Sequence, residues 1–310
     1  MIVVVAANPA LDLTYTVDAL RPGASHRVRA VTQRGGGKGV NVARVLSQLG
    51  HSTVVIGLAG GVAGHQLRAD LDAAHLRHRL VPVPGETRRT VTVVAGGDAT
   101  VFNEPGPVVD EVAWAALVEG AARALGDGAT GLVCSGSLPP GAPADGYAAL
   151  VRLARDRRIP VVVDAEGVPL LAAATAGADL AKPNAAELAA TTGVTSHLQA
   201  ARVLREAGAG AVAVSLGADG MLAVTGQGTW HACTPHRLAG NPTGAGDAAA
   251  AAFAVGMAGG QAWAGMLRHA VALSAAAVLA PVAGSVDVAA YHRLLPDVHV
   301  EETDAARLDR

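Results

Sequence analysis

Short, unbroken apolar runs recur along the chain, and the segments between them have helical spacing. The runs cover residues 2–6, 54–58, 131–134, 161–163 and 211–215. A strand that is apolar at every position is buried on both faces, which is typical of a parallel sheet between layers of helices. Between the runs, apolar side chains stand three or four positions apart, as at Val42, Val45, Leu46 and Leu49. This alternation predicts an α/β fold with a parallel sheet.

The length of 310 residues suits one continuous domain of this kind, which we expect to span residues 1–300. Two early stretches, about 11–31 and 87–103, break the alternation of strand and helix. The second places β-branched residues on both sides of Gly96-Gly97-Asp98, which predicts a hairpin. We expect both stretches to form a small β lid beside the main sheet. The charged tail, 301–310, predicts a frayed end.

Composition excludes several classes of protein. The chain is 51% hydrophobic, with 3 Trp, 3 Tyr and 2 Phe, which excludes intrinsic disorder and disfavours stacking on nucleic acid. The net charge of -2 provides no general attraction for polyanions, so we expect no nucleic-acid partner. Apolar stretches end well before the ~20 residues of a membrane span, so we expect no membrane partner. Two cysteines and no evident signal peptide favour the cytoplasm.

Scarce residue types mark the loops of the predicted sheet. Lysine occurs only twice, and both lysines lie in turns that contain glycine or proline. Asparagine occurs five times, always at the end of an apolar run or the start of a helical one. Ligands bind at such positions in α/β proteins, although asparagine also suits turns on conformational grounds. The residues are Lys38, Lys182, Asn8, Asn41, Asn103, Asn184 and Asn241.

The segment Asn241-Pro-Thr-Gly-Ala-Gly-Asp247 precedes an Ala-rich helical run that continues to Met257. A glycine turn that opens onto a helix leaves backbone N–H groups unpaired and favours an anion there. Asp247 would stand beside that anion, where a carboxylate can accept the proton of an incoming hydroxyl. An aspartate in the first turn also stabilises a helix without any catalytic role, and the two roles are compatible.

A second glycine loop, Gly35-Gly36-Gly37-Lys38-Gly39-Val40-Asn41, lacks the spacing of a P-loop and of a dinucleotide fingerprint. Lys38 with Arg88 or Arg89 could bind a phosphate and so select a phosphorylated sugar. Asp12 could accept two hydrogen bonds from sugar hydroxyls. Each of these features has a structural alternative, namely a tight turn, an exposed pair on an edge strand and a turn-stabilising aspartate.

Asn184 and Glu187 stand three positions apart after Lys182-Pro183. Such a pair could hold a hydrated Mg²⁺ ion that bridges substrate phosphates. The same spacing forms a capping box at a helix N-terminus, and spacing alone favours the cap.

Taken in order, the motifs resemble those of the ribokinase, or PfkB, carbohydrate kinase family, and within it 1-phosphofructokinases and tagatose-6-phosphate kinases. The resemblance runs through nearly the whole chain. It rests on Asn8-Pro-Ala-Leu-Asp12, Gly36-Gly-Lys38-Gly-Val-Asn41-Val-Ala-Arg44, Gly85-Glu-Thr-Arg88, Ser135-Gly-Ser137-Leu-Pro-Pro-Gly141, Lys182-Pro-Asn184 with Glu187, Val214-Ser215-Leu-Gly217-Ala-Asp-Gly220 and Gly244-Ala-Gly246-Asp247.

The resemblance implies a three-layer α/β/α sandwich with a β-sheet lid, and it implies ATP and Mg²⁺ as cofactors. It implies that Asp247 is the catalytic base and that the amides of Gly244, Ala245 and Gly246 form an anion hole. The residues that it implies for the sugar or its phosphate are Asp12, Gly37, Lys38, Asn41, Arg88 and Ser137. Those implied for ATP are Lys182, Asn184, Ser215, Gly217, Gly220, Thr243, Gly244 and Gly246. Asn184 and Glu187 would serve Mg²⁺ through water.

Departures from the family pattern indicate the substrate. Val101 stands where relatives that act on fructose 6-phosphate usually carry an arginine, and Lys38 replaces their small residue. We therefore expect an ATP-dependent kinase that converts fructose 1-phosphate to fructose 1,6-bisphosphate, with tagatose-6-phosphate kinase or another sugar kinase as alternatives. The alternative from a different functional class is a sugar-phosphate sensor, which binds the sugar phosphate but does not catalyse a reaction. Relatives often dimerise through their lids, and a monovalent cation such as K⁺ near Asn241 and Thr243 is left open.

Overall fold

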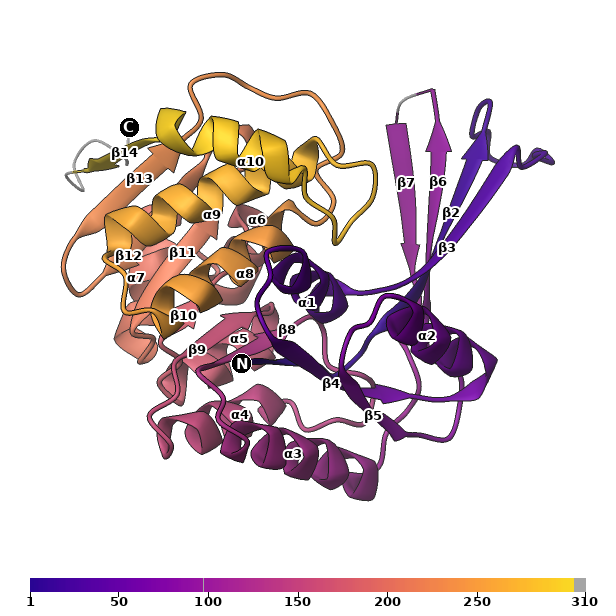
Figure 1. The fold of residues 1–310 in the computed structure, drawn as a ribbon, viewed down its shortest axis with the longest axis horizontal. Coiled ribbons are helices and arrows are strands. Elements are labelled where there is room, and N and C mark those ends of the chain that lie inside the picture. Colours follow the sequence, from indigo (N-terminus) through magenta and orange to yellow (C-terminus); the bar gives the residue numbers. More distant parts are fainter. Residues whose placement is uncertain (97, 304–310) are drawn as a thin grey trace.

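The computed structural model describes residues 1–96 and 98–303. Within these residues the larger sheet has ten strands in the order β14-β13-β12-β11-β10-β9-β8-β1-β4-β5 (Figure 1). The strands from β5 to β11 in this order pair in parallel, and β12 to β14 continue antiparallel. The bounds are β1 Ile2–Ala6, β4 Thr53–Ala59, β5 His78–Pro82, β8 Gly131–Ser135, β9 Val161–Asp164, β10 Leu180–Ala181, β11 Ala211–Ser215, β12 Met221–Thr225, β13 Thr229–Cys233 and β14 His299–Glu302.

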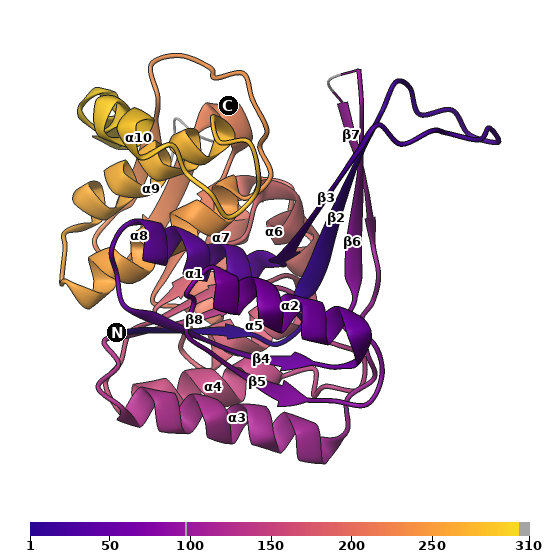
Figure 2. The same ribbon diagram turned by 45° about the vertical axis from the view of Figure 1, so that its right-hand side comes forward.

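Helices cover both faces of this sheet (Figures 1 and 2). Helices α1 Lys38–Gln48, α2 Gly61–Ala73, α8 Ala245–Ala258, α9 Trp263–Val278 and α10 Val288–Leu294 contribute to one core layer. Helices α3 Glu111–Gly126, α4 Gly146–Arg155, α5 Gly167–Thr175, α6 Ala185–Thr192 and α7 His197–Ala207 contribute to the other. Short 3₁₀ turns cover Gly217–Asp219 and Leu295–Asp297.

All five residues of β1 are buried, and their side chains alternate between two cores, which explains the three layers. Val4 packs in the first core layer, whereas Val3 and Val5 pack in the second. A strand whose successive side chains enter two cores must be apolar throughout, which is the pattern that the sequence shows. The predicted three-layer α/β/α fold is confirmed. No helix within the described ranges has the length and apolar character needed to cross a membrane.

A separate four-stranded sheet stands beside the sandwich, in the order β3-β2-β6-β7 (Figure 2). Its strands are β2 Ala10–Val17, β3 Ala30–Gly36, β6 Arg89–Ala95 and β7 Asp98–Asn103. Strands β6 and β7 pair antiparallel, which confirms the hairpin, although Gly97 of its turn lies outside the described residues. Strand β3 runs beyond position 31, so Gly35 and Gly36 belong to a strand rather than to a loop.

The prediction of a frayed tail over 301–310 was wrong at its first two residues. Glu301 and Glu302 belong to β14, where they pair with His231 and Trp230 of β13. Backbone pairing with the sheet edge fixes these residues despite their charge, because the side chains of an edge strand remain in solvent. Residues 304–310 lie outside the described part of the chain.

Candidate active site

The candidate site lies at the carboxyl edge of the large sheet, where ligands bind in open α/β sheets. Strand β9 ends at Asp164, Lys182 follows β10, and β11 ends at Ser215. The N-termini of α1 (Lys38–Gln48) and α8 (Ala245–Ala258) meet at this edge, because Lys38 pairs with Asp164 at the end of β9 and Asn41 hydrogen-bonds to Asp247. Backbone N–H groups at these two helix starts therefore point towards one region.

Asp247 is buried in the first turn of α8, with 6% of its surface exposed. The side-chain amide of Asn41 donates a hydrogen bond to Asp247 Oδ2 over 2.8 Å, which joins α1 to α8. Burial, reinforced by the nearby carboxylate of Asp164, raises the pKa of Asp247 to about 7. A carboxylate with a pKa near the working pH is well suited to general base catalysis.

The glycine turn before Asp247 adopts a conformation that favours glycine and leaves amides free at the start of α8. Gly244 caps α8 with φ of 90°, and a Cβ atom there would lie 3.1 Å from the backbone nitrogen of Gly284. The N–H of Ala245 donates to the carbonyl of Pro242 over 3.2 Å. Among the described residues, the N–H groups of Gly244 and Gly246 have no such acceptor. Two of the three predicted anion-hole amides are therefore available.

Two lysines and two carboxylates form a cluster beside this turn. Lys38 Nζ lies 2.7 Å from Glu187 Oε1 and 3.4 Å from Asp164 Oδ1, and Lys182 Nζ lies 3.4 Å from Asp164 Oδ2. Burial lowers the pKa of Lys38, but Asp164 and Glu187 together raise it above the ordinary lysine value. Lys38 is thus protonated at neutral pH and lies near Asp247, whose charge also acts on it.

Asn184 and Glu187 form the capping box that their spacing predicts. The backbone N–H of Glu187 donates to Asn184 Oδ1 over 2.8 Å, and that of Asn184 donates to Glu187 Oε2 over 2.9 Å. Because Glu187 also pairs with Lys38, both of its carboxylate oxygens already have partners. The pair fits a role in which it contacts a metal only through water.

Arg88 and Asp12 lie on the side of the site that faces the small sheet. Arg88 Nε donates to the carbonyl of Asn8 over 3.0 Å, and its charge acts on Asp12. Burial raises the pKa of Asp12, and hydrogen bonds from Thr90 and the backbone of Gly37 partly oppose this.

The loop that contains Asn8, between β1 and β2, also holds Ser137 in place. Asn8 Nδ2 donates to Ser137 Oγ over 3.2 Å and to the carbonyl of Pro105 over 2.9 Å. Five of the six residues predicted for the sugar therefore group around β2, α1 and this loop. The ammonium group of Lys38 instead lies beside the carboxylates of Glu187 and Asp164.

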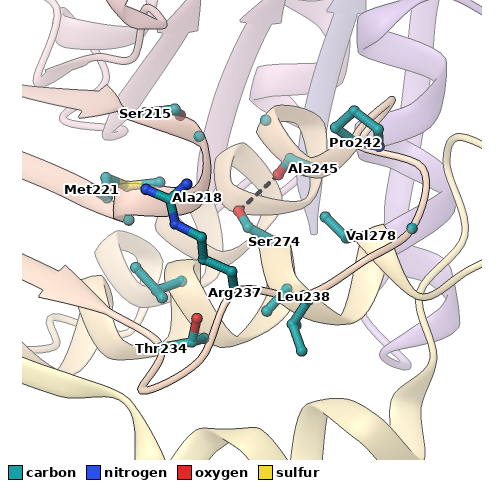
Figure 3. Close-up of a pocket in the computed structure, with 16 residues that line it drawn as sticks. Ser215, Ala218, Met221, Thr234, Arg237, Leu238, Pro242, Ala245, Ser274 and Val278 are labelled. Atoms are coloured by element: carbon teal, nitrogen blue, oxygen red, sulfur yellow. Dashed lines mark hydrogen bonds between the residues drawn. The ribbon is translucent and has the colours of Figure 1, made fainter.

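A cleft of about 300 Å³ opens between the end of β11 and helices α8 and α9 (Figure 3). It is lined by Ser215, Gly217 and Gly220, as the sequence predicts for ATP, and also by Gly246. Ser274 on α9 donates to the carbonyl of Ala245 over 2.8 Å and so braces the start of α8. Within the described chain, the buried hydroxyl of Ser215 has no hydrogen-bond partner, which fits a group supplied by a bound nucleotide.

Other residues predicted for ATP surround this cleft at different distances. Thr243 does not line it, although its neighbour Pro242 does. Lys182 lies beside the turn, since a Cβ atom on Gly246 would be 3.3 Å from Lys182 Nζ. Asn184 is held by the capping box described above.

Sequence reasoning missed two residues of the site. Asp164 is 1% exposed and lies between both lysines. Its signal was present, since an acidic residue directly follows the apolar run 161–163 and so ends a buried strand. Arg237 lines the cleft and donates to Asp219 over 2.8 Å. Nothing in the local pattern around Arg237 indicated this position.

Comparisons with known proteins identify the family and the fold. The family model for pfkB family carbohydrate kinases matches residues 1–288. Phosphofructokinase-2 from Escherichia coli, solved with potassium, is 28% identical over 100% of this chain and 99% of its own, with a TM-score of 0.88. A possible 1-phosphofructokinase from Thermotoga maritima is 25% identical over 98% of this chain and 100% of its own, with a TM-score of 0.89. Ribokinase from Arabidopsis thaliana, at 22% identity and a TM-score of 0.75, shares the fold.

The fold and these matches define a class of protein, the sugar phosphotransferases. More particularly, the chain belongs to the pfkB family of carbohydrate kinases, as the resemblance in its sequence predicted.

Proposed function

We propose that this kinase transfers the γ-phosphoryl group of ATP to a ketohexose phosphate, and that its preferred reaction converts fructose 1-phosphate to fructose 1,6-bisphosphate. The observation that carries the proposal is the place of Asp247. This buried carboxylate lies in the first turn of α8, next to Gly246, which lines the cleft that we propose for the nucleotide. Asn41 joins Asp247 to α1, and Gly37 at the start of α1 packs close to Arg88.

In this mechanism Asp247 accepts the proton of the acceptor's free primary hydroxyl. The hydroxyl oxygen attacks the γ-phosphorus, and the bond from that phosphorus to the β–γ bridging oxygen breaks, which releases ADP. The N–H groups of Gly244 and Gly246, with the ammonium groups of Lys38 and Lys182, stabilise the charge on the transferring group. Lys38 and Lys182 reach this position because Asp164 and Glu187 hold them.

The residues present fit a magnesium ion that is bound mainly through ATP and water. Glu187 and Asp164 put negative charge beside the lysines, while the oxygens of Glu187 are already occupied by Lys38 and the backbone of Asn184. Bound Mg²⁺ would neutralise phosphate charge during transfer. Asn184 and Glu187 remain the proposed water-mediated contacts.

Arg88 is the residue that we propose for the phosphate already on the acceptor. Charged hydrogen bonds contribute about 1.5–3 kcal/mol each, so one arginine favours a phosphorylated sugar by roughly 10–150-fold. Val101 supports fructose 1-phosphate over fructose 6-phosphate, because its strand β7 offers no arginine at that place. Tagatose 6-phosphate is the second candidate acceptor. Phosphofructokinase-2 from E. coli has been solved with fructose 6-phosphate, so fructose 6-phosphate is a third acceptor to compare.

Initial rates with a panel of acceptors test this proposal. We expect kcat/KM for fructose 1-phosphate to exceed that for free fructose by about 10-fold or more, because only the phosphorylated sugar pairs with Arg88. Tagatose 6-phosphate and fructose 6-phosphate are compared in the same assay. A higher kcat/KM for either would reassign the substrate, and absence of ADP formation with every acceptor would favour the sensor.

The pH dependence of the reaction should follow Asp247. Its carboxylate must be deprotonated to act as a base, and its pKa is raised to about 7. We therefore expect kcat/KM to fall as the pH drops below 7, approaching about tenfold per pH unit, and to level off above 8. Because sugar phosphates themselves titrate near pH 6, kcat at saturating acceptor is measured alongside. A kcat that is constant from pH 5.5 to 8 would contradict the role of Asp247.

Three further expectations remain proposals. A homodimer through the small sheet is supported by its exposed apolar residues Val31, Val101 and Phe102, while phosphofructokinase-2 from E. coli has a tetrameric inhibited form. A monovalent cation near Asn241 is supported by the potassium complex of that relative. The free cysteines suit the cytoplasm that we propose as the location.

A further inference from the structure

A second hollow, of about 370 Å³, lies at the opposite end of α1 from Lys38. Its walls come from the end of α1 and from α8, α9 and α10, with an apolar floor that includes Ala252, Val255 and Leu273. Helix α1 has 11 residues, so the hollow is roughly 16 Å along the helix from the active site. We name it the α10 pocket. Its volume falls within the range of small-molecule sites.

The polar rim of the α10 pocket consists of hydrogen-bonding groups. Gln48, His51, Gln261, His269, Tyr291 and His292 line it, and no acidic residue of the described chain is among its lining residues. His269 Nδ1 lies 2.6 Å from the hydroxyl of Tyr291, so α9 and α10 hold these two groups together. Amides, imidazoles and a phenolic hydroxyl can donate hydrogen bonds to an anionic group, no carboxylate stands among these lining residues to repel it, and the floor favours an apolar body.

One hydrogen bond connects the pocket to the active site. Gln48 Oε1 accepts from the backbone N–H of Val286 over 3.1 Å. Val286 belongs to the segment 280–287 that follows α9. In that segment, Gly284 packs so closely that an added Cβ atom would lie 2.7 Å from Asn41 Oδ1, and its nitrogen faces Gly244. A shift of this segment would therefore alter its contacts with Asn41, which hydrogen-bonds to Asp247, and with the glycine turn.

The same segment holds the small sheet. Arg34 on β3 donates to the carbonyl of Ala283 over 3.0 Å and to Ser285 Oγ over 3.1 Å. Arg34 also lies near Asp12, on which its charge acts. The segment 280–287 thus touches the pocket through Gln48, the glycine turn through Gly284 and the acceptor side of the site through Arg34.

We propose that the α10 pocket is an effector site for a small organic anion with an apolar body, and that a bound anion activates the enzyme through Gln48 and the segment 280–287. A ligand that joins the end of α1 to α10 restrains Gln48 and so stabilises the contacts of Gly284 and Arg34. The expected result is a lower KM for the acceptor, by about fivefold or more, which is the usual size of coupling between sites. The inference holds for whichever sugar phosphate the enzyme prefers.

Binding is tested by calorimetry on the full chain with phenyl phosphate and benzoate, and with neutral benzyl alcohol as the control. Fragments of this size reach a Kd of roughly 1 mM. We expect both anions to bind more tightly than the alcohol. Gln261→Trp, at an exposed position of the pocket, should abolish binding, while the matched Gln227→Trp in the exposed β12–β13 turn should not. Val255→Phe is a second filling variant should Gln261→Trp fail to fold.

Coupling is tested by kinetics with the best acceptor. The probes should lower its KM in the wild type, and Gln48→Ala should still bind them but lose this effect. Phenyl phosphate can also compete with the acceptor for Arg88. The effect of benzoate on the acceptor's KM therefore decides whether the two sites are coupled. Lack of binding, binding without a change in KM, or an equal change in Gln48→Ala would each overturn the proposal. Calorimetry needs no turnover, so a failure of the proposed activity remains distinguishable.

Discussion

Replacing Asp247 with asparagine should lower kcat by about 10²–10⁴-fold while leaving the affinity for ATP nearly unchanged. The substitution keeps the shape of the side chain and its contact with Asn41, which lies 2.8 Å away, but removes the group that accepts the proton. Because Asp247 is not among the residues that line the cleft with Ser215 and Gly217, we expect the nucleotide contacts to be preserved. Single-turnover rates and calorimetric titration with an ATP analogue measure the two quantities.

Asp145→Asn is the matched control, since Asp145 is an exposed aspartate at the start of α4 that accepts no capping hydrogen bond. Its kcat should equal that of the wild type. An Asp247→Asn variant that retains more than a tenth of the wild-type kcat would rule out Asp247 as the base.

Replacing Lys38 with methionine should lower kcat by about 10²–10³-fold, with a much smaller effect on the acceptor's KM. The ammonium group pairs with Glu187 and Asp164 and lies near Asp247, and we propose that it contacts the transferring phosphoryl group. Arg88→Met is the contrasting variant. It should raise the acceptor's KM by roughly 10–150-fold, because it removes a charged hydrogen bond to the acceptor's phosphate.

Steady-state kinetics of the two variants separate these roles. Thermal unfolding of each variant shows whether the fold survives, and Lys38→Arg should recover part of the lost rate by restoring the charge. If Lys38→Met instead raises the acceptor's KM and keeps kcat, Lys38 binds the phosphate of the acceptor, as the sequence alone suggested.

Local patterns in the sequence predicted the fold class and the centre of the candidate site. Apolar runs predicted the parallel strands β1, β4, β8, β9 and β11 but not β5 or the two-residue β10, and the glycine turn predicted the start of α8 and the place of Asp247. The partners of Lys38 could not be predicted in this way, because Lys38 and Glu187 are 149 positions apart and meet only through packing at the sheet edge. Asp164 was missed although its place directly after the apolar run 161–163 marks the end of a buried strand. Its importance comes from two lysines that approach it from different elements.

The central claim is that Asp247 and the glycine turn drive phosphoryl transfer to a sugar phosphate. The most direct measurement follows wild-type enzyme, MgATP and fructose 1-phosphate by ³¹P NMR. We predict loss of the γ-phosphate signal of ATP together with the growth of a second phosphomonoester signal on the sugar, without free phosphate. If the sugar phosphate binds by calorimetry but the ATP signals stay unchanged or yield only inorganic phosphate, the account is contradicted.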